Sequence, residues 1–217
     1  MQRMPEHPRD YTRAERRSDA IVHVTGLTAA ALGVPALVIL AVVIRGDLSA
    51  IVAIAIYGAA LCAMLGFSAL YHMVRHPGWT PIFRRLDHSA IYWKIAGTYT
   101  PFTLLSGHGV TLLAGLWAAA MAGTGLRVFA PYRFRAVNLT LYPAMGWAGA
   151  VAGWSIFAAL SAPVLGLVIA GGSLYTLGMI FYLWEKLPYH NTIWHVFVLI
   201  ASMLFFAAIT THVVQTA

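Results

Sequence analysis

The chain is 217 residues long, and 60% of its residues are hydrophobic while only 10% are charged. This composition excludes a soluble globular protein and indicates a polytopic membrane protein. The net charge of +7 is also found among nucleic-acid-binding proteins, but here the basic residues lie in alternate loops beside apolar runs, where they set membrane topology. We therefore expect no nucleic-acid partner.

Seven apolar runs are each long enough to cross a bilayer, which takes roughly 17–25 residues as an α-helix. In chain order they cover residues 21–44, 50–72, 89–105, 111–128, 139–160, 164–184 and 192–214. Because the connections are short, we expect one all-α domain over residues 21–217, a seven-helix transmembrane bundle, preceded by a cytoplasmic segment over residues 1–20. The protein is accordingly predicted to be a multi-pass protein of the cell membrane.

The basic residues predict how this bundle is oriented. Of the 14 Lys and Arg residues, all but two precede the first run or lie in the loops that follow the second, fourth and sixth runs. The exceptions are Arg45, in a loop on the opposite side, and Lys94, within the third run. Since Lys and Arg are retained on the cytoplasmic side of short loops, the N-terminus is predicted to be cytoplasmic.

A few ionisable side chains within or beside the apolar runs are predicted to meet at the cytoplasmic face. They are His72 at the end of the second run, Asp87 before the third, and His190 and His195 around the start of the seventh. Ser68 lies four residues before His72 and hence on the same side of that helix. Imidazoles and a carboxylate brought together by separate helices are typical of a catalytic zinc site. The alternative is a buried hydrogen-bonded network that only holds the helices together.

Two further features concern the interior of the runs. Lys94 is expected either to extend its ammonium toward the membrane surface or to pair with a carboxylate, and the sequence favours neither. Pro101 and Pro143 lie inside the third and fifth runs. Proline removes a helical hydrogen bond, so we expect both helices to bend there.

Six sequence motifs carry a family resemblance. They are Glu15-x3-Asp19-x3-His23, Ser68-Ala-Leu-Tyr-His72, Leu86-Asp87-His88, Gly97-Thr-Tyr-Thr-Pro101-Phe102, Ala144-Met-Gly-Trp147, and Leu187-Pro-Tyr-His-Asn-Thr-Ile-Trp-His195. Through them the chain resembles the hemolysin III branch of the progestin and adipoQ receptor family, seven-span membrane proteins that are similar to the alkaline ceramidases. The likeness covers nearly the whole chain.

The resemblance implies a zinc ion held by His72 and by two histidines of a His-x3-His pair on the last span. It also implies that Asp87 holds or activates water at the metal, with Ser68 close by, so these two residues are the predicted catalytic groups. His195 fits the second member of the pair. The first position, however, holds Asn191, and the neighbouring histidine is His190.

A spacing of five places His190 and His195 about 140° apart on a regular helix, too far for a shared ion. In one arrangement Asn191 is the N-cap of the last helix, and His190 folds back from the preceding loop as the third ligand. In the other, His190 faces the cytoplasm, and Asp87 or Asn191 completes a poorer site. The predicted ligands are His72, His195 and His190.

A second departure is Asp19, where the family more often has asparagine. We interpret Glu15, Asp19 and His23 as a structural or gating cluster at the cytoplasmic mouth rather than as a metal site.

The function predicted from these residues is zinc-dependent hydrolysis of an amide or ester bond in a membrane lipid. The lipid would be the partner, as substrate or ligand. Two other functions stay open at this point, namely a cytolytic or channel-like hemolysin, and a membrane-homeostasis sensor without catalysis.

Overall fold

The computed structural model describes residues 11–130 and 133–217, and these residues form helices joined by short loops. The helices are α1 (Arg13–Ile44), α2 (Leu48–Met73), α3 (Thr80–Ser106), α4 (Val110–Phe129), α5 (Arg135–Gly146), α6 (Ala148–Ala152), α7 (Trp154–Ala159), α8 (Ala162–Leu183) and α9 (His190–Gln215). The predicted all-α class is confirmed. The predicted boundary at residue 20 does not mark a change of structure, because α1 begins at Arg13.

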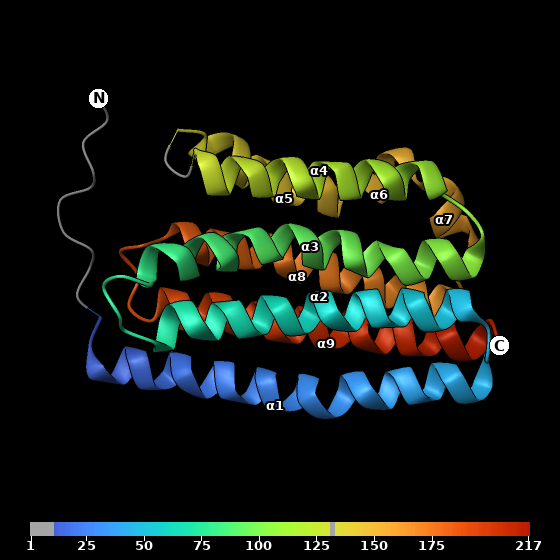
Figure 1. Cartoon of the computed structure of the whole chain (residues 1–217), viewed down its shortest axis with the longest axis horizontal. Coiled ribbons are helices and arrows are strands. Elements are labelled where there is room, and N and C mark those ends of the chain that lie inside the picture. The colour runs from blue at the N-terminus through green and yellow to red at the C-terminus, as the bar shows by residue number, and fades with distance from the viewer. Residues whose placement is uncertain (1–10, 131–132) are drawn as a thin grey trace.

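The helices run up and down in chain order, and Figure 1 shows α1, α2, α3 and α4 side by side with α8 and α9 behind them. Helix α9 packs against both α1 and α8, so the last helix of the chain returns to the first. We call one end of the bundle, on the left in Figure 1, the α1-start end. There α1, α3, α5 and α9 begin and α2, α4 and α8 end.

Helix α1 starts with a capping box that draws its first turns into the bundle. The Thr12 side chain accepts a hydrogen bond from the Glu15 backbone N–H, and the Glu15 carboxylate accepts one from the Thr12 N–H at 2.8 Å. The other carboxylate oxygen of Glu15 accepts the Tyr189 N–H at 3.0 Å, just before α9. One acidic residue therefore caps α1 and ties it to α9.

Within residues 11–130 and 133–217, five helices are long and apolar enough to cross a membrane, namely α1, α2, α4, α8 and α9. These support a multi-pass membrane protein, while the predicted count of seven spans is not confirmed. Helix α3 has the length but is less apolar, because its buried face carries Asp87, Lys94 and several Thr hydroxyls. Its neighbours cover these groups, since α3 packs between α2 and α4.

The predicted span over residues 139–160 is wrong as one continuous helix. The chain breaks at Trp147 and again at Gly153, which leaves α5, α6 and α7 as three short pieces. Pro143 lies in the last turn of α5, in agreement with the predicted disturbance there. By contrast, α3 continues through Pro101 to Ser106.

The break at Trp147 is stabilised by a tyrosine from α3. The Tyr99 hydroxyl donates to the Gly146 carbonyl at 2.7 Å and accepts the Gly149 N–H at 3.0 Å. Gly149 also allows the close approach, because a Cβ there would lie 2.8 Å from the Tyr99 ring. A broken helix inside a membrane protein needs such partners for its released backbone groups.

Candidate metal centre

Four side chains from three helices meet at the α1-start end. They are Asp19 and His23 of α1, His72 of α2 and His195 of α9. Each offers one donor atom, and these atoms all lie within 4.8 Å of one another. Asp19, His23 and His195 are buried, and His72 is partly exposed. We call this group the four-residue cluster.

Asp19 lies at the centre of the four-residue cluster. Its Oδ1 is 2.6 Å from His195 Nδ1, and its Oδ2 is 3.5 Å from both His23 Nε2 and His72 Nδ1. An ionised carboxylate can only accept hydrogen bonds, so His195 Nδ1 carries the ring proton and donates the hydrogen bond to Asp19. His195 Nε2 is then the nitrogen with a lone pair for a metal ion, and the carboxylate fixes the ring in that tautomer.

The three imidazoles face one another closely. The His195 ring centroid lies 4.4 Å from that of His23 and 4.5 Å from that of His72. His23 and His72 stack, with centroids 5.4 Å apart. Protonation of more than one of these rings would place like charges side by side, which favours the neutral, ligand-competent form of imidazole.

The four-residue cluster fits a divalent transition metal by its chemistry. Imidazole nitrogens and a carboxylate oxygen are the donors that zinc takes in proteins, usually four of them. The buried His23 Nε2 makes no hydrogen bond to the described part of the chain. A bound ion would satisfy this nitrogen, which has the Asp19 carboxylate 3.5 Å away but lacks the hydrogen bond that buried polar atoms normally make.

Two of the three predicted ligands, His72 and His195, meet in the four-residue cluster. The third, His190, lies at the first position of α9, where its Nε2 is 3.0 Å from the Tyr11 hydroxyl. Of the two arrangements left open, the one in which Asn191 caps α9 is not observed, because the N-cap is Tyr189, which adopts a positive φ of 59°. His190 is therefore the first residue of the helix rather than part of a loop. Its role as a ligand stays a prediction.

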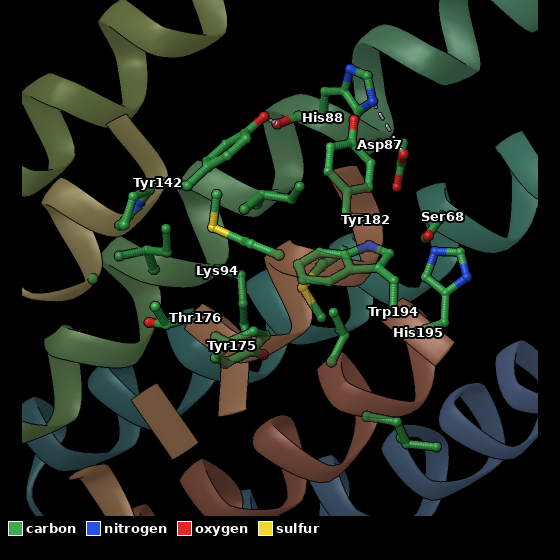
Figure 2. A pocket seen from close by; sticks show the side chains of 18 of the residues that line it. Ser68, Asp87, His88, Lys94, Tyr142, Tyr175, Thr176, Tyr182, Trp194 and His195 are labelled. Atoms are coloured by element: carbon green, nitrogen blue, oxygen red, sulfur yellow. Dashed lines mark hydrogen bonds and ion pairs between the residues drawn. The ribbon is translucent and has the colours of Figure 1, made fainter. Parts of the chain in front are cut away.

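The predicted catalytic residues lie beside the four-residue cluster rather than in it. The Asp87 carboxylate is within hydrogen-bonding reach of the Ser68 side chain. Its Oδ2 is also 4.0 Å from His88 Nε2. Figure 2 shows Ser68 between His195 and Asp87, so the three predicted groups line one side of the same pocket.

This pocket is a cavity of about 790 Å³ that runs from the four-residue cluster into the bundle. Its inner walls include Phe102, Ile156 and Phe157, while Ser68, His72, Asp87 and other polar groups line its opposite part. Apolar walls with a few convergent polar groups are typical of a ligand site, and this volume matches a drug-sized or lipid-sized ligand.

Sequence comparison identifies the family. A profile of the family described as "Haemolysin-III related" matches residues 13–206. The chain belongs to this family. The Hemolysin-3 of Bacillus cereus is 41% identical over 208 residues, which is 94% of both chains. The Hemolysin-3 homolog of Bacillus subtilis (strain 168) is 38% identical over 210 residues, 94% of this chain and 97% of that protein.

A more distant relative is the human Monocyte to macrophage differentiation factor, 29% identical over 168 residues, 71% of this chain and 67% of that protein. The predicted resemblance to the hemolysin III branch is therefore confirmed. Together with the five apolar helices, it makes this haemolysin III-related chain a multi-pass membrane protein.

Asp19 and His23, which belong to the four-residue cluster of this haemolysin III-related protein, were not among the metal ligands predicted from the sequence. The pattern that could have revealed them is Asp19-x3-His23 itself, since two residues four apart share a helix face. The Thr12 and Glu15 capping pair signals that a helix begins before these residues. Residues 13–20 therefore form the first turns of α1.

Proposed function

We propose that this protein binds a zinc ion at the four-residue cluster and uses it to hydrolyse an amide or ester bond of a membrane lipid. The single observation that carries the proposal is the convergence of three imidazoles and a carboxylate at one wall of a largely apolar cavity. A site of this kind joins metal ligands to a compartment that accepts acyl chains. In the proposed ligand set His23 stands where we had expected His190.

His23, His72 and His195 would hold the ion, with Asp19 either as a fourth ligand or as the acceptor that orients His195. Bound zinc would polarise a carbonyl oxygen and lower the pKa of a coordinated water toward about 7. With Asp19 as an orienting group and not a ligand, one coordination position stays open, as catalytic zinc sites require.

Asp87 is the proposed proton acceptor. Its carboxylate lies in the cavity wall on the same side as His195, with Ser68 between them, and can accept a proton from water that attacks the substrate carbonyl. The proton can then pass to the leaving amine or alcohol, which balances the hydrolysis. Ser68 can donate its hydroxyl hydrogen to Asp87 and so keep the carboxylate aimed at the cavity.

The proposal is tested by metal analysis and lipid turnover on the purified full-length chain. We expect about one zinc ion per protein, lost on His195→Ala, and hydrolysis of a fluorescent ceramide or phospholipid that is lost on Asp87→Ala while zinc is retained. The exposed His108→Ala is the matched control and should leave both unchanged. Turnover that persists in both His195→Ala and Asp87→Ala would refute the proposed function.

A further inference from the structure

A buried arginine shares the cavity with the four-residue cluster but belongs to neither the proposed ligands nor the proposed proton acceptor. Arg127 lies in the last turn of α4, is only 5% exposed and lines the cavity. Its Nη2 donates to the Tyr142 hydroxyl at 3.2 Å, and its guanidinium carbon lies 5.9 Å from the centre of the Tyr142 ring. The Tyr142 hydroxyl in turn donates to the His88 carbonyl at 2.9 Å.

Among the described residues no carboxylate forms a contact ion pair with Arg127, and the Asp87 carboxylate that attracts it lies farther along the same cavity wall. Tyr142 is a neutral phenol, and Arg127 forms no ion pair at contact distance with any carboxylate in residues 11–130 or 133–217. Its Nε is buried and makes no hydrogen bond to the described residues. A charged side chain inside a membrane protein is costly unless it pairs, so such a residue marks a binding site.

The depth of Arg127 matches that of lipid headgroups. Helix α4 has 20 residues and a length of about 30 Å, close to the thickness of the hydrocarbon core. A helix of this length that spans the core places its last turn at the level of the headgroups, here at the α1-start end of the bundle. Arg84 of α3 lines the same cavity. Basic pockets between transmembrane helices at this level are known to bind anionic headgroups.

We propose that Arg127 binds the phosphate of a glycerophospholipid whose acyl chains occupy the apolar part of the cavity. The planar guanidinium donates two parallel hydrogen bonds to phosphate oxygens, and its unpaired Nε is one of the donors suited to this geometry. The Tyr142 hydroxyl accepts a hydrogen bond from Nη2 and so helps to hold the guanidinium in place. The lipid in the cavity is thus a phospholipid rather than a neutral lipid. That this phospholipid is also the substrate rests on the proposed function, whereas its binding does not.

The test is a binding measurement on the full-length chain in detergent, with phosphatidylglycerol and diacylglycerol of the same acyl chains as probes. The two lipids differ by the phosphate-containing headgroup. We expect the wild-type protein to prefer phosphatidylglycerol by about tenfold or more, as a charge-assisted hydrogen bond provides. Equal affinity for the two lipids would overturn the proposal without any variant. Inorganic phosphate is a third probe, and its tight binding alone would overturn the assignment to a lipid.

Variants then test whether the preference for phosphatidylglycerol depends on Arg127. Arg127→Met should reduce it to near parity, and Arg127→Lys should retain part of it because the charge remains. Arg75→Met is the matched control, since Arg75 is an exposed cation between α2 and α3 that does not line the cavity, and it should leave the preference unchanged.

The Tyr142→Phe variant removes the hydroxyl that accepts a hydrogen bond from Arg127 but keeps the aromatic ring and the charge of Arg127. It therefore separates the effect of this hydrogen bond from the effect of the charge. A preference that disappears in Tyr142→Phe and persists in Arg127→Met would overturn the proposal. Binding is also measured in Asp87→Asn. If phospholipid preference persists there while no lipid is hydrolysed by the wild type, the proposed function fails and the Arg127 site stands.

Discussion

The most informative single substitution is Asp19→Asn, because it keeps the shape of the side chain and removes its charge. In the structure the carboxylate holds His195 Nδ1 at 2.6 Å and lies 3.5 Å from nitrogens of His23 and His72. The Asp19→Asn variant keeps one acceptor oxygen for His195 but attracts the metal less. It should therefore fold normally and bind zinc more weakly.

The size of the effect follows from these contacts. One charge-assisted hydrogen bond to an imidazole contributes about 1.5–3 kcal/mol, and removal of an orienting carboxylate typically lowers metal affinity by about 10–100-fold. We expect about 100-fold weaker zinc binding, which corresponds to about 2.7 kcal/mol. Asp19→Ala, which also loses the acceptor, should weaken it further.

The assay is a competition titration of the purified protein against a chromophoric zinc chelator at constant pH. His108→Ala serves as the control, because this exposed histidine lies in the loop between α3 and α4, and that loop is at the end of the bundle opposite the start of α1. Zinc affinities of Asp19→Asn and Asp19→Ala within twofold of the wild-type value would refute the assignment of Asp19 to the metal centre. The histidines would then hold the ion without help from the carboxylate of α1.

Three other outcomes are expected. Lys94 is buried, and its ammonium donates a hydrogen bond to Thr98 and lies 5.0 Å from the Tyr57 ring centre, without a carboxylate partner among the described residues. Lys94→Met should therefore stabilise the protein by about 1–4 kcal/mol. A melting temperature below that of the wild type would contradict this. Tyr99→Phe leaves the Gly146 carbonyl and the Gly149 N–H without their partner, and it should lower the free energy of unfolding by about 1–3 kcal/mol. An unchanged thermal transition would show that water replaces the hydroxyl. The hydrogen bond from the Ala50 N–H lowers the pKa of the Asp47 carboxyl. The cap therefore contributes its stabilisation of α2 above the unfolded pKa of about 3.9 and loses it as pH falls through the lower folded pKa. Hydrogen exchange at the start of α2, corrected for intrinsic rates, should rise at acidic pH in the wild type and lose this dependence in Asp47→Asn.

The sequence was sufficient to predict which helix ends converge. Apolar runs joined by short loops must alternate in direction, so the end of α2 and the start of α9 had to lie at the same end of the bundle. His72 and His195 are accordingly adjacent, with ring centroids 4.5 Å apart. That prediction needed only the order of the runs and their lengths.

The broken segment α5–α7 could not be predicted from its own residues. A run of apolar residues reads the same whether its helix is continuous or interrupted, and Pro101 in α3 shows that a proline alone does not decide it. The interruption depends on Tyr99, which lies in another helix and satisfies the released backbone groups of Gly146 and Gly149. This is a tertiary contact, invisible to local patterns.

Helix geometry also supports His23 rather than His190 as the third imidazole of the proposed zinc site. His190 and His195 share a regular helix, and five residues place their side chains on different faces. His23 comes from α1, whose position beside α9 is set partly by the hydrogen bond from Tyr189 to Glu15. The capping residue and the cluster residues thus act together, since a helix that began later would leave Asp19 and His23 outside the bundle.

The charge of Asp19 explains why this arrangement suits a membrane interior. A divalent cation with three neutral imidazoles keeps its full double charge, which is costly to bury in a low-dielectric region. The Asp19 carboxylate beside the imidazoles would balance half of that charge within the cluster, whereas asparagine would leave it unchanged. The same argument predicts that His23 depends on Asp19 for its place at the metal. A double variant of Asp19→Asn and His23→Ala should therefore lose less zinc affinity than the sum of the two single losses, and strict additivity of the free energies would show that the two residues act independently.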